Sequence, residues 1–215
     1  MRYLICGDIH GNLPALQLLL KKENGNYDVF VSHGDVVNFG PWSNECVELL
    51  NELPNKLLLK GNHESYFING AYPGTNAIAK LFFNHCYPSF NRFKEINAYK
   101  EGDFCGIYSV QHTIYDNYVF ENSVVCIKNN FIIGHTHHQF INYQNAFHIV
   151  NTGSVGQNRK FINEVNYIMY NDANNSLQLM GFLYDPQLII NEFKARNFPE
   201  PCIAYYSNKP FKQPL

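Results

Sequence analysis

Apolar residues in the first third of the chain fall alternately into short continuous runs and into a helical repeat. Residues 3–6, 28–32 and 56–59 are short apolar runs typical of buried strands, and a glycine follows each of them closely. Between these runs, the apolar residues of segments 13–22 and 44–53 recur at the spacing of an amphipathic helix. This alternation predicts βαβ units and hence a parallel sheet.

The later part of the chain is richer in short strand-like runs. Residues 65–103 come first, and we expect this aromatic segment to form a helical insertion with short helices around residues 77–84. A last helix is expected over residues 188–196, followed by an irregular, proline-rich tail from residue 198. No segment has the composition of a linker, so residues 1–215 are predicted to form a single domain. The expected strands of this part are residues 107–110, 131–133, 147–150, 165–170 and 177–183.

Clusters of polar residues lie directly after five of the predicted strands. Ligands of α/β proteins bind beyond the carboxyl ends of the strands, so we expect these clusters to meet at one place. A glycine precedes the key residue in four of the five clusters, where it lets the chain turn sharply out of the strand. The clusters are Gly7-Asp8-Ile9-His10-Gly11-Asn12, Gly34-Asp35, Gly61-Asn62-His63-Glu64, Gln111-His112 and Gly134-His135-Thr136-His137.

The side chains in these clusters are carboxylates, amides and imidazoles. Such oxygen and nitrogen donors suit Mn²⁺, Fe, Zn²⁺ or Ni²⁺ and differ from the thiolates of a soft-metal site. One carboxylate can bridge two ions, which lie roughly 3.5–4 Å apart in two-metal sites. We therefore expect a centre that holds two metal ions at the loop ends of the strands.

Each cluster also has a purely structural interpretation when it is taken alone. Asp8 or Asp35 would fit a turn or a helix cap, and Asn12 is placed to cap the first helix. A lone histidine such as His112 is more often a core or surface residue than a ligand. The occurrence of all five clusters in order at strand ends favours the metal centre. His138 faces away from its neighbour by strand alternation and is assigned no role.

Charge and composition then exclude several classes of protein. The formal net charge of −2 gives no strong field for nucleic acid or for a membrane surface, so no stable nucleic-acid partner and no membrane partner are expected. The chain has no apolar run of about 18 residues, and the run at its N-terminus is too short for a signal peptide. The six cysteines form no CxxC pair and are interpreted as reduced core residues. These features predict a cytoplasmic protein of unspecified oligomeric state.

The ordered motifs resemble those of the calcineurin-like metallophosphoesterase family: Asp-x-His, Gly-Asp, Gly-Asn-His-Asp/Glu, a lone His and Gly-His-x-His. The same order is present between residues 7 and 137. Residues 34–50 and 151–159, and Tyr184-Asp185 before the last helix, are also similar to segments of the small bacterial and archaeal phosphodiesterases of that family. The resemblance implies an α/β fold, a four-layer α/β/β/α sandwich with mixed sheets. The insertion at 65–103 would then lie over the active-site face.

The resemblance also implies the roles of particular residues in a site with two divalent ions, Mn²⁺ before Fe, Ni²⁺ or Zn²⁺. One ion would be held by Asp8, His10, Asp35 and His137. The other would be held by Asp35, Asn62, His112 and His135, so that Asp35 bridges the two. The catalytic residues would be Asp35 and His63, the latter protonating the leaving oxygen or steadying the phosphoryl charge. The substrate would contact Asn12, Asn62, His63 and Arg159.

The activity implied is hydrolysis of a small-molecule phosphodiester or nucleotide polyphosphate by a hydroxide that bridges the two ions. Phosphoprotein phosphatases of this superfamily carry Gly-Asp-x-x-Asp-Arg-Gly and Gly-Asn-His-Glu-x-Arg, whereas this chain has Asn38, Phe39 and Tyr66 at the distinctive positions. An arginine fork is the natural grip for a phosphate dianion, so its loss favours a diester. A phosphoprotein or other phosphomonoester phosphatase is one alternative. A non-catalytic metal-binding scaffold is another, although no ligand position is substituted.

Two departures concern how the substrate is held. Thr113 follows His112 where the family often has glycine, and residues 113–117 contain no arginine. The phosphate grip would therefore come from elsewhere, with Arg159 the best-placed arginine. The aromatic residues of the 65–103 insertion would suit stacking on a nucleobase, but core packing is the favoured interpretation.

Overall fold

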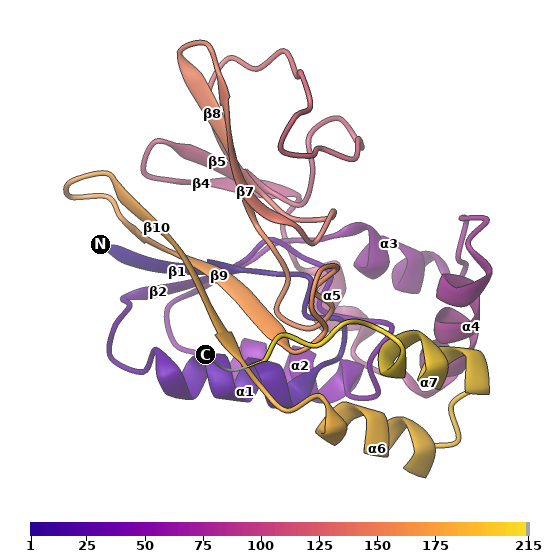
Figure 1. The fold of residues 1–215 in the computed structure, drawn as a ribbon. Coiled ribbons are helices and arrows are strands. Elements are labelled where there is room, and N and C mark those ends of the chain that lie inside the picture. The colour runs from indigo at the N-terminus through magenta and orange to yellow at the C-terminus, as the bar shows by residue number, and fades with distance from the viewer. Residues whose placement is uncertain (214–215) are drawn as a thin grey trace.

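Two five-stranded mixed sheets pack against each other in the computed structural model, which describes residues 1–213 (Figure 1). The first sheet has the strand order β10-β9-β1-β2-β3, in which β1, β2 and β3 are parallel and β9 and β10 are antiparallel additions. Its parallel start is as predicted, and β9 and β10 match the strands expected over residues 165–170 and 177–183. The strands are β1 (Arg2–Cys6), β2 (Val29–Ser32), β3 (Lys56–Leu58), β9 (Glu164–Asn171) and β10 (Ser176–Leu183).

The second sheet has the order β4-β5-β6-β8-β7, with a parallel centre and an antiparallel strand at each edge. Its two edge strands, β4 and β7, were not predicted, because an edge strand needs no long apolar run and both contain polar residues. The strands are β4 (Gly102–Cys105), β5 (Tyr108–Gln111), β6 (Asn130–Ile133), β7 (Gln139–Gln144) and β8 (Phe147–Thr152).

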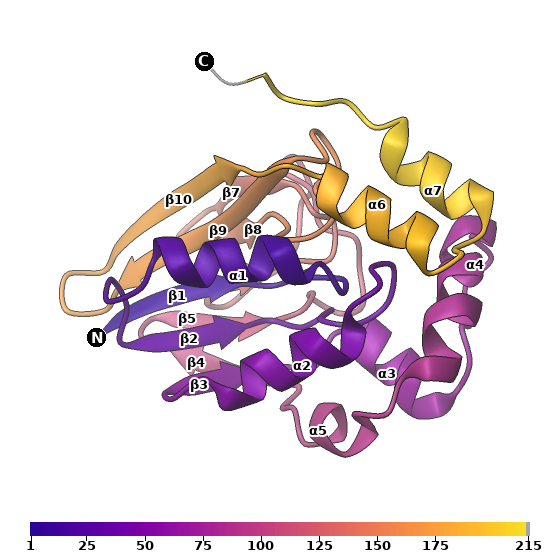
Figure 2. The ribbon, with the colours of Figure 1, turned by 90° about the horizontal axis from the view of Figure 1, so that it is seen from below.

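Alternation along β1 explains how the first sheet is buried on both faces. Tyr3 and Ile5 point into an apolar core between the two sheets, which they share with residues of β5, β6 and β8. Leu4 and Cys6 point the other way, into a larger core beneath the helices. Helices α1 (Leu13–Lys22) and α2 (Ser43–Glu52) lie along that outer face (Figure 2).

The segment that follows β3 is helical and lies at one end of the first sheet (Figure 2). It contains α3 (Asn62–Asn69), α4 (Ala77–Cys86), the 3-10 turn Tyr87–Ser89 and α5 (Phe93–Asn97). The predicted helix near residues 77–84 is confirmed as α4, whereas α3 was not predicted. The aromatic residues of this segment lie in two environments. Tyr66 and Tyr72 are half-buried, and those buried in the core are Phe67, Phe82, Phe83 and Phe90.

The C-terminal tail is a correction to the sequence prediction. Helix α6 (Gln187–Ala195) was expected, but the irregular tail predicted from residue 198 contains a further helix, α7 (Glu200–Ser207). Pro201 lies in its first turn, where a missing N–H breaks no helical hydrogen bond. Cys202, Ile203 and Tyr206 are buried in the helix-side core, and this burial fixes the helix.

The outer face of the second sheet is covered by an irregular segment, residues 114–127, in place of a fourth, helical layer. Ile114 and Val119 pack there against the β6, β7 and β8 side chains Ile133, Phe140 and Ile149. The segment has no helical repeat of apolar residues, so it forms turns. The expected α/β class, with two mixed sheets and flanking helices, is confirmed. Within residues 1–213, no helix combines the length and apolar character that crossing a membrane requires.

Candidate active site

All of the polar clusters found in the sequence meet at one end of the two sheets. Five of the seven predicted ligand positions have a left-handed backbone, with φ of 48° at Asp8, 47° at His10, 53° at Asp35, 69° at His135 and 60° at His137. This conformation is uncommon for residues other than glycine. Each strand therefore ends in a sharp turn that directs its polar side chain back toward the others.

Four donor atoms form the first group. The Nε2 atoms of His10 and His137 lie 3.2 Å apart, and His137 Nε2 lies 3.2 Å from Asp8 Oδ1. His10 Nε2 is 3.8 Å from Asp35 Oδ2. All four side chains are buried. The structure thus brings together the four residues predicted for the first ion.

The second group shares one atom with the first. Asp35 Oδ2 lies 3.2 Å from His112 Nε2, which is 3.0 Å from Asn62 Oδ1 and 3.1 Å from His135 Nδ1. These are the four residues predicted for the second ion. Asp35 Oδ2 is therefore the atom that faces both groups.

Hydrogen bonds leave the facing atoms of both aspartates and of two histidines available to a cation. The backbone N–H of His135 donates to Asp8 Oδ2, and that of His63 donates to Asp35 Oδ1, so the other oxygen of each carboxylate faces the centre. The Nδ1 atoms of His10 and His137 lie 3.2 and 2.8 Å from the carbonyl oxygens of Val37 and Gln157. Donation to a carbonyl puts the proton on Nδ1 and leaves the Nε2 lone pair free, as in metal-binding histidines.

The electrostatics of the centre favour ligand-ready protonation states. Burial raises the pKa of Asp8, but the facing His137 outweighs it and holds that pKa below its usual value. Burial also raises the pKa of Asp35, but the charge of the facing His112 lowers it more, so the pKa of Asp35 lies well below its usual value. Burial holds the pKa of His10 well below its usual value and, with the charge of His112, lowers that of His135 to about 4. The carboxylates are thus charged and these two imidazoles neutral at pH 7, the forms that bind a metal ion.

An unmatched carboxylate oxygen tests whether a cation fits this centre. Asp8 Oδ1 is buried and has no hydrogen-bond partner among residues 1–213, although an isolated buried carboxylate oxygen is costly. Burial lowers the pKa of His112, but the Asp35 carboxylate raises it to about 9, so the centre stabilises a positive charge beside Asp35. The donor set of carboxylate oxygens, an amide oxygen and imidazoles suits a divalent transition metal.

His63 lies beside the centre and is held by a residue that the sequence analysis did not assign. Its Nδ1 atom lies 2.9 Å from the side-chain amide of Asn38, a hydrogen-bond contact that turns Nε2 toward the cavity. Its ring packs edge-on against that of His10, 5.1 Å away between centroids. Burial lowers the pKa of His63. His63 Nε2 can therefore act as a proton donor toward the cavity, with Asn38 fixing the ring.

Glu64 organises the backbone that carries the bridging aspartate. Its carboxylate accepts hydrogen bonds from the backbone N–H groups of Asp35, Val36, Val37 and Gly61, at 2.7 to 3.1 Å. Burial and the neighbouring Asp35 charge raise the pKa of Glu64 to about 7, against the effect of these donors. The sequence analysis assigned Glu64 no role beyond its place in a motif. Its signal was an acidic residue three positions into a helix, where its carboxylate accepts a hydrogen bond from the backbone N–H of the N-cap residue Gly61.

His33 is a second buried residue that the sequence analysis missed. Its ring occupies the space beneath the centre that a Cβ atom would take at Gly7 or Gly134, only 2.2 and 2.0 Å away. His33 Nε2 bonds to Thr152 Oγ1 at 2.7 Å. These two glycines are therefore required by the close approach of His33 as well as by the turns. Its position directly before Gly34-Asp35 was the only signal available.

The residues predicted to contact the substrate occupy two different environments. Arg159 is exposed and lines the cavity above the centre, where its guanidinium donates to the Tyr205 hydroxyl at 2.6 Å. Asn12 is fully buried. It caps α1 by accepting from the Ala15 N–H, and its amide nitrogen donates to Gly156 O and the Tyr184 hydroxyl. The structure therefore brings Arg159 to the site, while the contacts of Asn12 are those of a structural cap.

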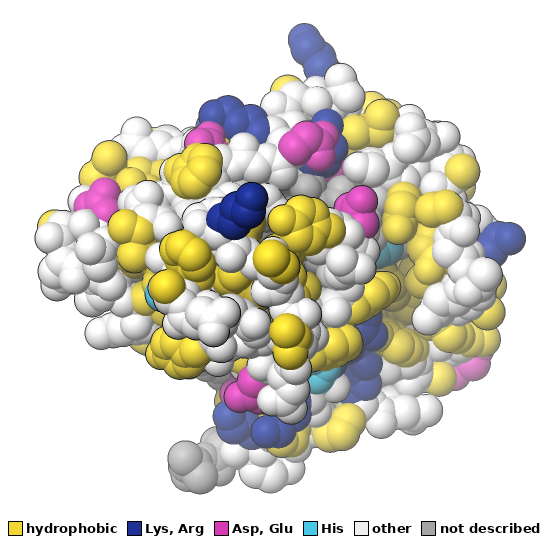
Figure 3. Space-filling view, turned by 90° about the horizontal axis from the view of Figure 1, so that it is seen from above, with side chains coloured by type: hydrophobic (Ala, Val, Ile, Leu, Met, Phe, Trp, Pro, Cys, Tyr) yellow, Lys and Arg dark blue, Asp and Glu magenta, His cyan; other side chains and the backbone are white. Residues whose placement is uncertain are grey.

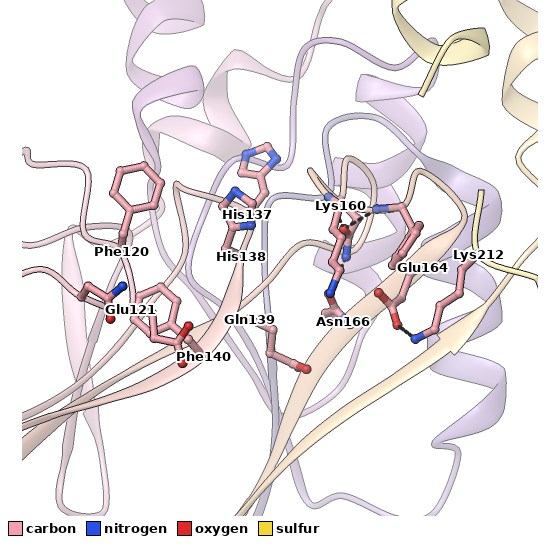
Figure 4. A pocket seen from close by; sticks show the side chains of 13 residues that line it. Phe120, Glu121, His137, His138, Gln139, Phe140, Lys160, Glu164, Asn166 and Lys212 are labelled. Atoms are coloured by element: carbon pink, nitrogen blue, oxygen red, sulfur yellow. Dashed lines mark hydrogen bonds and ion pairs between the residues drawn. The ribbon is translucent and has the colours of Figure 1, made fainter. Parts of the chain in front are cut away.

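Three cavities surround the centre. The inner one, about 140 Å³, is lined by His10, Asp35, His63 and Arg159 among others. An outer groove of about 540 Å³ adjoins it on the side of Asn62, His112 and His135. A third cavity of about 490 Å³ has Phe120 and Glu121 on one side and Lys160, Glu164 and Lys212 on the other, with His138 between them (Figure 4).

His137 and His138 provide an internal comparison for metal binding. We expect His137→Ala to weaken Mn²⁺ binding roughly a hundredfold, because its Nε2 faces Asp8 and His10 across the centre. His138→Ala should leave Mn²⁺ binding unchanged, since this side chain is exposed and belongs to neither donor group. Isothermal titration calorimetry of the metal-free proteins with Mn²⁺ measures both effects. Equal losses in the two variants would contradict the assignment.

Comparisons with known proteins agree with this geometry. A family model described as calcineurin-like phosphoesterase matches residues 1–182. An uncharacterized protein of Methanocaldococcus jannaschii is 28% identical over 229 aligned positions, covering 91% of this chain and 93% of that protein. A metallophosphoesterase structure from Sphaerobacter thermophilus matches with a TM-score of 0.80 at 21% identity, covering 96% of this chain and 98% of that one. An archaeal phosphodiesterase structure matches with a TM-score of 0.51 at 14% identity, covering 85% of this chain and 100% of that one. The chain belongs to the calcineurin-like phosphoesterase family.

Proposed function

We propose that this protein is a phosphodiesterase that uses two divalent metal ions, Mn²⁺ before Fe, Ni²⁺ or Zn²⁺, to hydrolyse a phosphodiester or a nucleotide polyphosphate. The observation that carries the proposal is the shared position of Asp35 Oδ2, which lies 3.8 Å from His10 Nε2 in one donor group and 3.2 Å from His112 Nε2 in the other. One carboxylate between two complete donor groups is the arrangement that a two-metal phosphoesterase requires.

The roles of the protein groups follow from their positions. Asp8, His10 and His137 would hold one ion, and Asn62, His112 and His135 the other, with Asp35 between them. Two bound ions supply an activated water and stabilise negative charge on the phosphoryl oxygens. Once protonated to the imidazolium form, His63 would give its Nε2 proton to the departing alkoxide and become neutral, while Asn38 lies against its Nδ1 and keeps the ring in place. Arg159 is the proposed contact for the outer phosphoryl oxygens, and Asn62 and His63 would also touch the substrate.

The preference for a diester rests on how few positive side chains face the inner cavity. Among the described residues that line it, Arg159 is the single arginine, and its guanidinium is partly engaged by Tyr205. A phosphate monoester dianion is gripped best by a bidentate arginine pair, whereas a diester carries one negative charge less. A phosphomonoester phosphatase and a non-catalytic metal-binding scaffold are the alternatives that the experiment must separate.

Hydrolysis of two matched chromogenic substrates tests the proposal. With Mn²⁺, we expect methyl p-nitrophenyl phosphate, a diester, to be cleaved with a higher kcat/KM than p-nitrophenyl phosphate, a monoester. EDTA should abolish both rates, and added Mn²⁺ should restore them. A higher kcat/KM for the monoester would identify a phosphatase. A folded protein that binds metal but hydrolyses neither ester would support the scaffold.

A further inference from the structure

We propose that the outer groove beside the metal centre is a binding site for the nucleobase of the substrate, which the tyrosines Tyr66, Tyr115 and Tyr118 hold by stacking. This inference rests on the proposed function, because it assigns a substituent to the phosphoester cleaved in the inner cavity. It makes the substrate a nucleotide and not a simple phosphodiester.

The groove is continuous with the place where hydrolysis is proposed. Tyr66 and Tyr118 line both the inner cavity of about 140 Å³ and the outer groove of about 540 Å³. The inner cavity is the smaller of the two, so the part of a bound phosphoester remote from the metal centre would extend into the outer groove. The volume of the outer groove lies in the range of small-molecule sites. Figure 3 shows histidine side chains within a furrow, with hydrophobic side chains along both of its sides.

The tyrosines present their rings to this groove, although tyrosines in a protein of this size are usually better covered. Tyr115 and Tyr118 are 72% and 66% exposed. The Tyr118 ring lies 4.3 Å from the ring of His135, measured between centroids, so it stands directly beside the second donor group. Tyr66 faces the same opening from α3, with its ring 5.3 Å from that of His63. The groove thus has aromatic surface on both of its sides, next to the centre.

The loop that carries two of these tyrosines is fixed in an unusual conformation. Tyr115 and Asp116 both have a left-handed backbone, with φ of 53° and 55°. The turn is closed by the backbone bridge between Ile114 and Asn117, and Ile114 is anchored in the core on the outer face of the second sheet. A left-handed backbone is costly for a tyrosine, and such strain is retained where it serves a site. The loop therefore displays Tyr115 and Tyr118 on a rigid base.

A nucleobase is the occupant that matches these features. Every base has a flat π face that stacks on aromatic side chains without a need for a particular sequence of hydrogen bonds. The lining also carries amide and hydroxyl groups from Gln111, Thr113 and Ser65, which suit the polar edge of a base. Outside the metal centre, Lys60 is the single lysine or arginine among the described residues of the lining; it forms an ion pair of 3.0 Å with Glu101, and Asp116 adds a negative charge, so the groove does not favour a further phosphate.

Direct binding of two phosphate esters to the Mn²⁺-loaded protein tests this site. Isothermal titration calorimetry would compare adenosine 5′-monophosphate with ribose 5-phosphate, which differ only in the base. We expect the nucleotide to bind about tenfold more tightly. Tyr118→Leu and Tyr115→Leu should each reduce this preference, and Tyr118→Phe should keep it. Tyr143→Leu is the matched control, because Tyr143 is 76% exposed on β7, away from the groove, and the preference should be unchanged.

The outcomes separate this inference from the proposed function. Equal affinities for the two ligands, or a preference that survives both leucine substitutions, would overturn the nucleobase site. If methyl p-nitrophenyl phosphate is hydrolysed while the two ligands bind equally, the phosphodiesterase stands and the groove assignment fails. If nothing is hydrolysed but the preference is present and falls in Tyr118→Leu, the groove is a base site on a protein with another activity.

Discussion

Replacing Asp35 by asparagine is expected to lower Mn²⁺-dependent hydrolysis of the diester by at least about a thousandfold. Asp35 Oδ2 lies within 3.8 Å of His10 Nε2 and within 3.2 Å of His112 Nε2, so one substitution weakens both donor groups. An amide oxygen is neutral and is a poorer metal ligand than a carboxylate. Charge stabilisation by bound metals is worth several kcal/mol, and each 1.36 kcal/mol is a factor of ten in rate.

The measurement is kcat for methyl p-nitrophenyl phosphate, together with the metal content after gel filtration. Asp35→Asn keeps the side-chain shape, and asparagine also accepts the left-handed backbone at this position, where φ is 53°. Asp185→Asn is the matched control, because Asp185 is exposed and accepts a hydrogen bond from the Gln187 N–H, as asparagine can. A rate that stays within tenfold of the wild-type value in Asp35→Asn would refute the bridging role.

Replacing His63 by glutamine is expected to reduce kcat by roughly a hundredfold to a thousandfold, the usual contribution of a general acid. Its Nδ1 is held by Asn38, so its Nε2 proton is the one available to a leaving oxygen. A better leaving group needs less protonation, so the loss should be larger for a methyl alkyl phosphodiester than for a p-nitrophenyl ester. The comparison of these two substrates separates proton donation from a general loss of structure.

The metal content of His63→Gln distinguishes two roles for this histidine. Its ring nitrogen lies close enough to a ring nitrogen of His10 and a carboxylate oxygen of Asp35 for the three to form another possible metal-binding group. If His63 is the proton donor, the variant keeps the metal content of the wild type. Loss of one ion together with activity would make it a ligand. His148→Gln controls for the substitution itself, because His148 lies at the start of β8, outside both donor groups, and its Nε2 bonds to the Tyr108 hydroxyl at 2.6 Å.

The arrangement of the first sheet and the convergence of the polar clusters were predictable because each depends on local pattern. Strand ends with a glycine before a polar residue are visible in one dimension, and a parallel sheet brings such ends together. Edge strands β4 and β7 were not predictable in the same way, because their stability comes from a partner strand rather than from their own apolar residues. Helix α7 likewise depends on burial of Cys202 and Tyr206 against distant parts of the chain.

The predicted ligand positions are adjacent in the structure, but the residues that hold them in place were largely invisible in the sequence. In the sequence, Asn38 only marked the loss of the second aspartate of the phosphoprotein phosphatase motif. Its bond to His63 forms only when α3 packs against the loop after β2. Glu64 acts on the backbone of a loop 29 residues away. Tyr115 and Tyr118 lie in a segment with no repeat, so nothing in the sequence connected them with the centre. These contacts join residues that are far apart in the sequence, so a local sequence pattern cannot predict them.

The left-handed backbone at Asp8, His10, Asp35, His135 and His137 has a consequence for how this protein can change over time. Each such conformation costs a non-glycine residue roughly 1–3 kcal/mol, so these positions lower the free energy of unfolding of the metal-free chain. A bound metal ion would offset this loss, because it binds the native state and stabilises it. A lineage released from catalysis would gain thermal stability by placing glycine or asparagine at these positions. The residues that would hold the ions are thus not the residues that would make this backbone most stable.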